Sequence, residues 1–140
     1  YYTIENDRVA EYIISDEEED ILYSLSYVNE YLSKITTDDY SITYLWNNGK
    51  LLSTKHEYLR DDYYYRSNHV LKYDGETCKG FFPFIVSYID LEDYLFYAMP
   101  QLIGASTIHL PSEDNFNNSE GDESKIKFIY DFFSLFFGSQ

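Results

Sequence analysis

The sequence is poor in basic residues. Lys and Arg together number 10 against 25 Asp and Glu, and the formal net charge is -15 at pH 7. A bias of the gene toward A and T would raise Lys together with Tyr, Asn and Ile, so the shortage of basic residues needs another cause. A surface this negative repels nucleic acid and anionic lipid. We therefore expect no direct nucleic-acid binding and no membrane binding.

Cysteine and the motifs of metal and cofactor sites are also scarce. The single cysteine, Cys78, cannot form an internal disulfide, which favours a reducing, cytoplasmic location. The three histidines, His56, His69 and His109, lie in separate segments without HxH or HExxH spacing. The sequence contains no GxGxxG, P-loop or GxSxG motif. We therefore predict no metal and no cofactor.

The length and composition are those of one folded domain. A chain of 140 residues has the ordinary size of a single domain, and a hydrophobic content of 44% is sufficient for a core. The clearest pattern is the segment SDEEEDILYSLSYVNEYLSKI, residues 15–35. Ser15 and Glu18 fit a helical capping box. The apolar residues then recur at alternating intervals of four and three, as on one face of a helix; they are Ile21, Leu25, Val28, Leu32 and Ile35. This spacing predicts a helix.

Two β-hairpins are predicted in the middle of the chain. Asn48-Gly49, within residues 40–59, suits a two-residue turn because both positions tolerate a positive φ. Asp74-Gly75 is the corresponding turn signal within residues 63–89. The flanking segments are rich in β-forming residues. Together these hairpins predict an antiparallel sheet of four or five strands.

The remaining segments predict further helices and one loop. Residues 91–103 and 124–140 indicate helices, the second ended by Gly138, and residues 105–111 indicate one short strand. The polar, acidic segment 111–124 predicts a mobile loop. The expected fold class is α+β, a mostly antiparallel four- to five-stranded sheet packed by two or three helices in a single domain.

Tyrosine is unusually frequent, with 17 residues. Within RDDYYYRSNH, residues 60–69, alternation along a strand places Tyr63 and Tyr65 on one face and Tyr64 on the other. The adjoining Tyr58, Tyr73 and Tyr88 extend this set, which predicts a tyrosine-rich patch on an open face of the sheet. Tyrosine provides a large contact area at a low entropy cost. Its high β-propensity is the competing structural explanation.

Charge and tyrosine together favour an acidic inhibitor that binds and occludes a basic protein. Two forms fit: an immunity protein that neutralises a nuclease toxin, or a phage or viral mimic of nucleic acid that inhibits a nucleic-acid-binding protein. The predicted binding residues are Asp61, Asp62, Tyr63, Tyr65, Asp16, Glu17, Glu18, Glu19 and Asp20. An alternative is a small-molecule or glycan-binding module that uses the tyrosine-rich sheet face.

A catalytic function is the least favoured hypothesis. If Asp74-Gly75 formed a two-residue turn, His69 and Cys78 would be diagonal neighbours about 7–8 Å apart on one face. A thiolate–imidazole dyad needs such proximity. However, no nucleophile motif surrounds Cys78, and a lone cysteine is more often a small packed residue. The sequence therefore predicts a binding protein and no enzyme.

Overall fold

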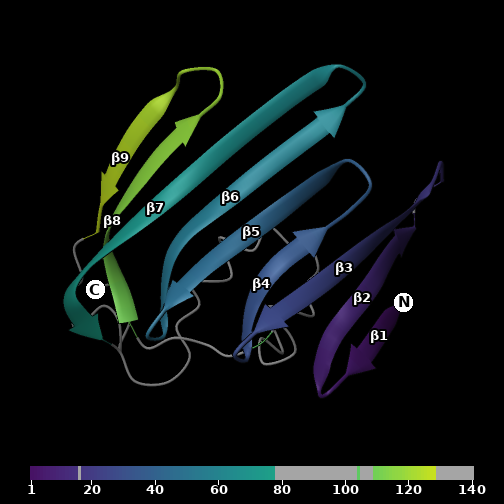
Figure 1. The fold of residues 1–140 in the computed structure, drawn as a ribbon, viewed down its shortest axis with the longest axis horizontal. Coiled ribbons are helices and arrows are strands. Elements are labelled where there is room, and N and C mark those ends of the chain that lie inside the picture. The colour runs from purple at the N-terminus through teal and green to yellow at the C-terminus, as the bar shows by residue number, and fades with distance from the viewer. Residues whose placement is uncertain (16, 78–103, 105–108, 129–140) are drawn as a thin grey trace, which may run out of the picture.

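The protein forms an antiparallel sheet of nine strands. The structure, a computed structural model, describes residues 1–15, 17–77, 104 and 109–128. Within these residues, the strands lie side by side in the same order as in the sequence (Figure 1). They are β1 (Tyr2–Glu5), β2 (Arg8–Ser15), β3 (Asp20–Val28), β4 (Tyr31–Thr36), β5 (Tyr40–Asn47), β6 (Lys50–Arg60), β7 (Tyr63–Thr77), β8 (His109–Asn118) and β9 (Glu123–Lys127).

The predicted α+β class is wrong, because the part of the chain that the structure describes is a nine-stranded sheet without a helix. The helix expected over residues 15–35 is instead the end of β2, all of β3 and most of β4. Asn29 and Glu30, with φ of 50° and 72°, reverse the chain between β3 and β4. A two-residue turn of this kind joins strands, so the apolar residues on either side of it pair across a hairpin.

The hairpin predicted around Asn48-Gly49 is confirmed, whereas the one around Asp74-Gly75 is wrong. Asn48 and Gly49 have φ of 50° and 76° and join β5 to β6. By contrast, β7 continues through Asp74 and Gly75 to Thr77. Gly75 has a φ of 100°, and the register between β7 and β8 shifts around it. Its conformational freedom therefore serves an irregularity within a strand and not a chain reversal.

The loop predicted over residues 111–124 is also wrong over most of its length. Residues 111–118 belong to β8, which pairs with β7 along its length, for example Phe116 with His69. Only residues 119–122 form a turn, after which β9 begins. The helix expected from residue 124 is therefore not formed at residues 124–127, which lie in β9.

Other predictions fall on parts of the chain that the structure does not describe. The helix expected over 91–103 and the remainder of the C-terminal helix, residues 129–140, lie outside the described residues. Of the short strand expected over 105–111, residues 109–111 form the start of β8. No helix in the described part of the chain is long and apolar enough to cross a membrane.

The two faces of the sheet differ in polarity. Leu25, Ile35 and Ile42 are neighbours across β3, β4 and β5 and are at most 7% exposed. They define the core face, and burial of each such side chain contributes about 1.5–3 kcal/mol to folding. The opposite, outer face carries Lys34 and Thr43, which are neighbours on β4 and β5 and both exposed. This alternation of apolar and polar residues fixes the register of the strands.

Candidate functional site: an acidic rim at one end of the sheet

The topology places alternate turns at opposite ends of the sheet. Because each strand runs antiparallel to its neighbours, the connections after β2, β4, β6 and β8 lie at one end (Figure 1). The connections after β1, β3 and β5 lie at the other end. Residues that are far apart in the sequence, such as those following β2 and β8, are therefore brought to the same end.

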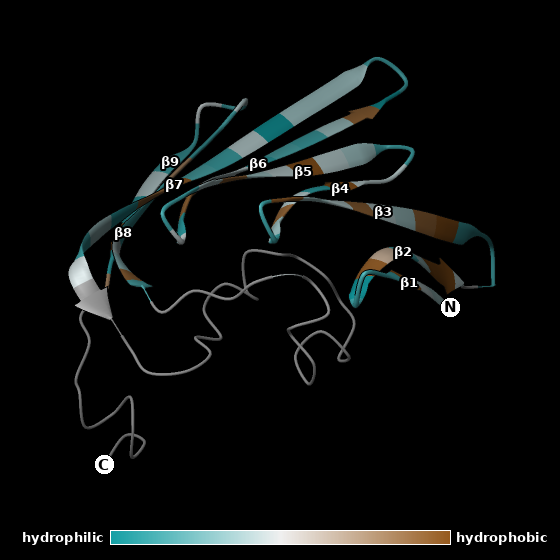
Figure 2. Ribbon diagram, turned by 60° about the horizontal axis from the view of Figure 1, so that its bottom comes forward, coloured by the Kyte–Doolittle hydropathy of each residue, from teal (hydrophilic) through white to brown (hydrophobic). Residues whose placement is uncertain are grey.

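The first of these ends is strongly acidic. Its turns and the adjoining strand ends hold eleven of the chain's 25 Asp and Glu. We call these residues the acidic rim: Glu17, Glu18, Glu19, Asp20, Asp38, Asp39, Asp61, Asp62, Glu120, Asp122 and Glu123. All eleven are exposed, and Figure 2 shows the turns at this end in the colour of hydrophilic residues.

The structure brings the two predicted acidic segments to one edge of the molecule. Residues 17–20 connect β2 to β3, and Asp61-Asp62 connect β6 to β7. Four strand spacings, roughly 19 Å in all, separate these connections. Asp16 lies outside the described residues. The acids at 38–39 and 120–123 were not predicted as binding residues, because only their place after an even-numbered strand brings them to the same end as the others.

The first three rim turns are linked through β6. The backbone N–H of Leu59 donates to the carbonyl of Asp39 at 2.9 Å, which holds the β4–β5 turn against the end of β6. Arg60, the last residue of β6, lies among the rim carboxylates. A hydrogen bond with Tyr58 and the nearby charges of Asp39 and Glu19 raise the pKa of the Arg60 guanidinium above its ordinary value. These turns thus share one electrostatic environment.

The fourth rim turn is held in a fixed shape by Asn118. Its Oδ1 accepts hydrogen bonds from the backbone N–H of Glu120 at 2.9 Å and of Asp122 at 3.0 Å. Ser119 then attaches the turn to β7: its N–H donates to the carbonyl of Arg66, and the N–H of Arg66 donates to its Oγ. The carboxylates of this turn are therefore positioned before any partner arrives, which lowers the entropy cost of binding.

Two exposed tyrosines adjoin the rim. Tyr63 and Tyr64 directly follow Asp62 and are 54% and 49% exposed. Tyr63 donates its hydroxyl hydrogen to Glu120 Oε1 at 2.8 Å, and this hydrogen bond raises the pKa of Tyr63. Tyr64 donates to Glu57 Oε2 at 3.0 Å on the outer face. Both rings are thus oriented by carboxylates while they remain accessible.

The prediction of a tyrosine-rich open face is wrong. Tyr65 pairs with Tyr58 and lies with Tyr63 on the core face, which leaves Tyr64 as the member of the triplet on the outer face. Tyr73 donates to the carbonyl of Leu51 at 2.7 Å and packs against the core. Tyr88 lies outside the described residues.

Tyrosines on the core face form instead a row behind the rim. Tyr12 and Tyr23 are stacked with ring centroids 4.4 Å apart, and Tyr40 meets the edge of Tyr23 at 6.3 Å. Farther along, Tyr58 and Tyr63 make an edge contact, also at 6.3 Å. Most of these rings are buried or half-buried, so their main role is to pack the sheet below the rim.

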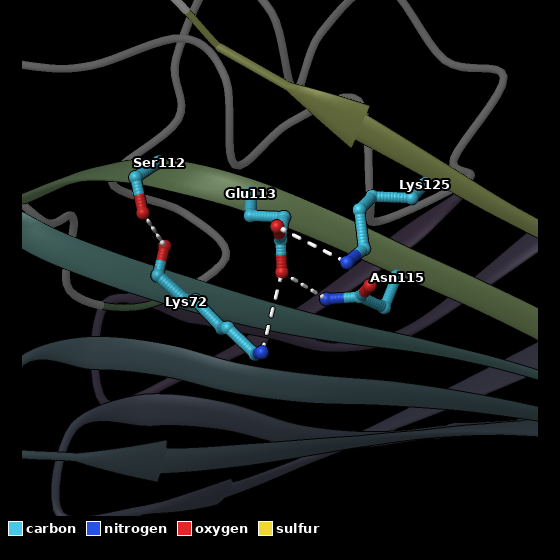
Figure 3. Close-up of polar contacts among 5 residues, drawn as sticks. All are labelled: Lys72, Ser112, Glu113, Asn115 and Lys125. Atoms are coloured by element: carbon cyan, nitrogen blue, oxygen red, sulfur yellow. Dashed lines mark hydrogen bonds and ion pairs between the residues drawn. The ribbon is translucent and has the colours of Figure 1, made fainter.

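The outer face is where basic residues gather. Six of the chain's ten Lys and Arg lie there: Lys34, Lys55, Arg66, Lys72, Lys125 and Lys127. Glu113 shows how acids are held on this face (Figure 3). Lys72 Nζ lies 3.3 Å from its Oε2, and Lys125 Nζ lies 3.6 Å from its Oε1. A hydrogen bond from Asn115 and these lysines lower the pKa of Glu113. Acid and base thus neutralise one another on the outer face, whereas the rim turns contain no Lys or Arg.

The two-residue turn on which the hypothetical His69–Cys78 dyad depended does not form, because β7 continues through Asp74 and Gly75. Cys78 itself lies outside the described residues. His69 Nδ1 lies 3.0 Å from both carboxylate oxygens of Asp114, a buried residue on β8. This contact joins β7 to β8. Among the described residues, no group of three or more His, Cys, Asp or Glu is arranged to hold a metal ion.

The chain was compared with protein-family models, with curated proteins and with solved structures. None of the three comparisons found a match. The functional interpretation therefore depends on the geometry and charge of the described residues, of which the acidic rim is the most distinctive feature.

Proposed function

We propose that this protein binds a basic protein through its acidic rim and occludes the partner's cationic surface. The observation that carries the proposal is the unequal distribution of acids between the two ends of the sheet. Eleven acidic residues lie at the rim, whereas the described turns and strand ends at the opposite end hold five: Glu5, Asp7, Glu30, Asp74 and Glu76. Arg8 and Lys50 also lie at that end, so five acids and two bases give its described residues a net charge of only about -3.

The mechanism of the proposal is electrostatic. Successive rim turns are two strands apart, about 10 Å, so the carboxylates form a row roughly 29 Å long across the sheet. Such a row attracts a positively charged groove and accelerates association by steering. A groove that binds nucleic acid has this character, and the rim carboxylates would stand where phosphates bind. An immunity protein for a nuclease toxin and a nucleic-acid mimic both act in this way.

The exposed tyrosines supply the contacts that electrostatics alone does not. Tyr63 is exposed and hydrogen-bonded to the rim carboxylate of Glu120, so an arginine or lysine of the partner could contact the ring face and a rim carboxylate together. Tyr64, also exposed, is hydrogen-bonded to Glu57 on the outer face. Aromatic residues held in place before binding are typical affinity anchors. The proposed action is occupation of the partner's surface without chemistry, in a reducing, cytoplasmic setting consistent with the single cysteine.

The proposal is tested with two charge-matched double variants. The variant Asp61→Asn/Asp62→Asn neutralises two rim acids, and Asp7→Asn/Glu30→Gln neutralises two acids at the opposite end. Proteins retained from cell extract by the immobilised chain at low salt are identified, and the affinity of a purified basic partner is measured for each variant. We expect the rim variant to weaken binding about tenfold, mainly through the association rate, and the control to change it less than twofold.

Two results would overturn this proposal. One is that no basic protein is retained at low salt and released as the salt concentration rises. The other is that both double variants weaken binding equally, since net charge alone would then explain the interaction.

A further inference from the structure

A pocket lies between β4 and β5 at the end opposite the rim. The ladder between these strands has three pairs and ends where Lys34 faces Thr43. Beyond that point, the strands line a cavity of about 470 Å³. Its walls are formed by Val28, Asn29, Tyr31, Ser33, Tyr44, Leu45, Trp46, Asn47, Asn48 and Gly49. This volume is within the range of small-molecule sites, roughly 300–1,000 Å³.

Trp46 bridges the two strands beyond the point where their ladder ends. Its indole Nε1–H donates to the carbonyl of Leu32 at 2.8 Å, which gives that carbonyl a partner where no strand pair is formed. The Trp46 ring also contacts the ring of Tyr31, with centroids 4.6 Å apart and planes tilted by 32°. The pocket is therefore held open by side-chain contacts, and two aromatic rings form part of its wall.

The described residues of the lining are all uncharged, in a chain in which 25% of the residues are charged. A charged ligand would lose hydration without meeting an opposite charge in the wall. The wall does offer hydrogen bonds, because its three asparagines carry side-chain donors and acceptors. A purely apolar ligand would cover these groups without bonding to them, which is unfavourable.

We infer that this pocket binds an uncharged saccharide ring. Aromatic rings contact the C–H faces of a sugar, and asparagine side chains can both donate to and accept from its hydroxyl groups. The site is separate from the acidic rim and does not depend on a basic partner. It also differs from the tyrosine-rich sheet face that the sequence predicted, because Trp46 and the asparagines define it.

Trp46 is the only tryptophan, so its fluorescence and its indole N–H resonance report on the pocket directly. The probes are neutral hexoses and N-acetylhexosamines, with glucose 6-phosphate and cyclohexanol as the charged and apolar counterparts. We expect at least one neutral sugar to shift the Trp46 signals with millimolar or tighter affinity. The charged and apolar probes should bind at least fivefold more weakly, a difference of about 1 kcal/mol.

Two variants test whether the sugar binds at this pocket. Asn47→Ala removes an amide from the pocket wall, whereas Asn68→Ala removes one from the outer face, where it donates to Asn117 Oδ1. Sugar affinity should fall about fivefold or more in the first variant and stay unchanged in the second, with both unfolding at temperatures close to that of the parent. The inference is overturned if no neutral sugar shifts the Trp46 signals, if cyclohexanol or the phosphate binds better, or if the two variants behave alike.

Discussion

The two ends of the sheet use their turns differently. At the end opposite the rim, each of the three turns that the structure describes has two residues and begins with asparagine: Asn6-Asp7, Asn29-Glu30 and Asn48-Gly49. Their asparagines have φ of 52°, 50° and 50°, a conformation that asparagine tolerates better than most residues. Backbone geometry therefore explains most of the residues at this end.

At the rim, backbone geometry explains few of the acidic residues. Of the eleven rim acids, Asp61 alone has a positive φ, at 54°. Glu17, Glu18 and Glu19 occupy exposed positions for which glutamate has no turn preference. Because neighbouring like charges reduce stability, a row of acids without a geometric role supports the proposed binding function. The comparison thus separates residues that shape the fold from residues that are available to a partner.

The largest effect is expected from a pair of glycines, one at each end. A Cβ added to Gly104 would lie 2.8 Å from the carbonyl oxygen of Glu30, and its φ is +103°. Gly121, in the last rim turn, has a φ of +88° but open space around it. We expect Gly104→Ala to lower the free energy of unfolding by about 3 kcal/mol and Gly121→Ala by about 1 kcal/mol. Urea denaturation of both variants measures the difference, and equal losses would show that both ends are equally constrained.

A smaller effect is expected at alkaline pH from Tyr27, at the end of β3 away from the rim. Burial raises its pKa from 10.0 to about 12, and its hydroxyl donates to the carbonyl of Val9 at 2.7 Å. The folded state holds the proton more tightly, so this stabilisation is complete below pH 10 and is lost as the pH rises toward 12. Its size is on the order of 1 kcal/mol after allowance for solvent screening.

Measurement of unfolding free energy against pH isolates this contribution. The parent should lose more stability than Tyr27→Phe over the interval from pH 10 to 12, because phenylalanine at position 27 has no proton to lose. Parallel curves for the two proteins would contradict the assignment to Tyr27.

Neutralising rim acids should stabilise the fold slightly. Asp61→Asn/Asp62→Asn relieves repulsion from the neighbouring turns, and we expect the free energy of unfolding to rise by about 0.5 kcal/mol at low salt. The gain should vanish at about 1 M salt, where charges are screened beyond roughly 3 Å. Asp7→Asn/Glu30→Gln should leave stability unchanged. A rim variant that is less stable than its control would mean that the acids support the fold.

The smallest expected effect is a change in the pKa of a tyrosine at the rim, compared with that of a tyrosine at the opposite end. A hydrogen bond to Glu120 is the main cause of the raised pKa of Tyr63, whereas burial is the main cause for Tyr27. Glu120→Gln should therefore lower the pKa of Tyr63 and leave that of Tyr27 unchanged. NMR titration of ring-labelled tyrosine measures both values in one sample, and a shift of both by the same amount would refute the distinction.

Local signals in the sequence were reliable where one short segment decides the structure. Asn48-Gly49 predicted its hairpin because both residues must accept a positive φ, and the conformation is independent of the rest of the chain. The segment 15–35 misled because its apolar residues fit a helix, while strand pairing with β2 and β5 satisfies the same residues better. Pairing partners distant in sequence are invisible to a periodicity argument.

The candidate site was predictable in part, because some of its residues form short runs that are visible in the sequence. The runs at 17–20 and 61–62 are conspicuous as sequences, and the alternation of Tyr63, Tyr64 and Tyr65 follows from strand geometry. Asp38-Asp39 is an equally visible pair, but nothing local shows that it and Asp122 lie at the same end as those runs. The segment that contains Asp122 was expected to be a loop, although pairing of β8 with β7 makes its first part a strand.

The sequence by itself determined the excess of acid over base, the single cysteine and tryptophan, and the residues able to turn the chain with a positive φ. The tertiary structure decided which acids are neighbours, because the turns after even-numbered strands lie at one end of the sheet and the turns after odd-numbered strands at the other. It also decided which side chains are covered, because a strand buries alternate residues only once its partners and register are set. A row of carboxylates at one end and an uncharged pocket at the other are consequences of that pairing.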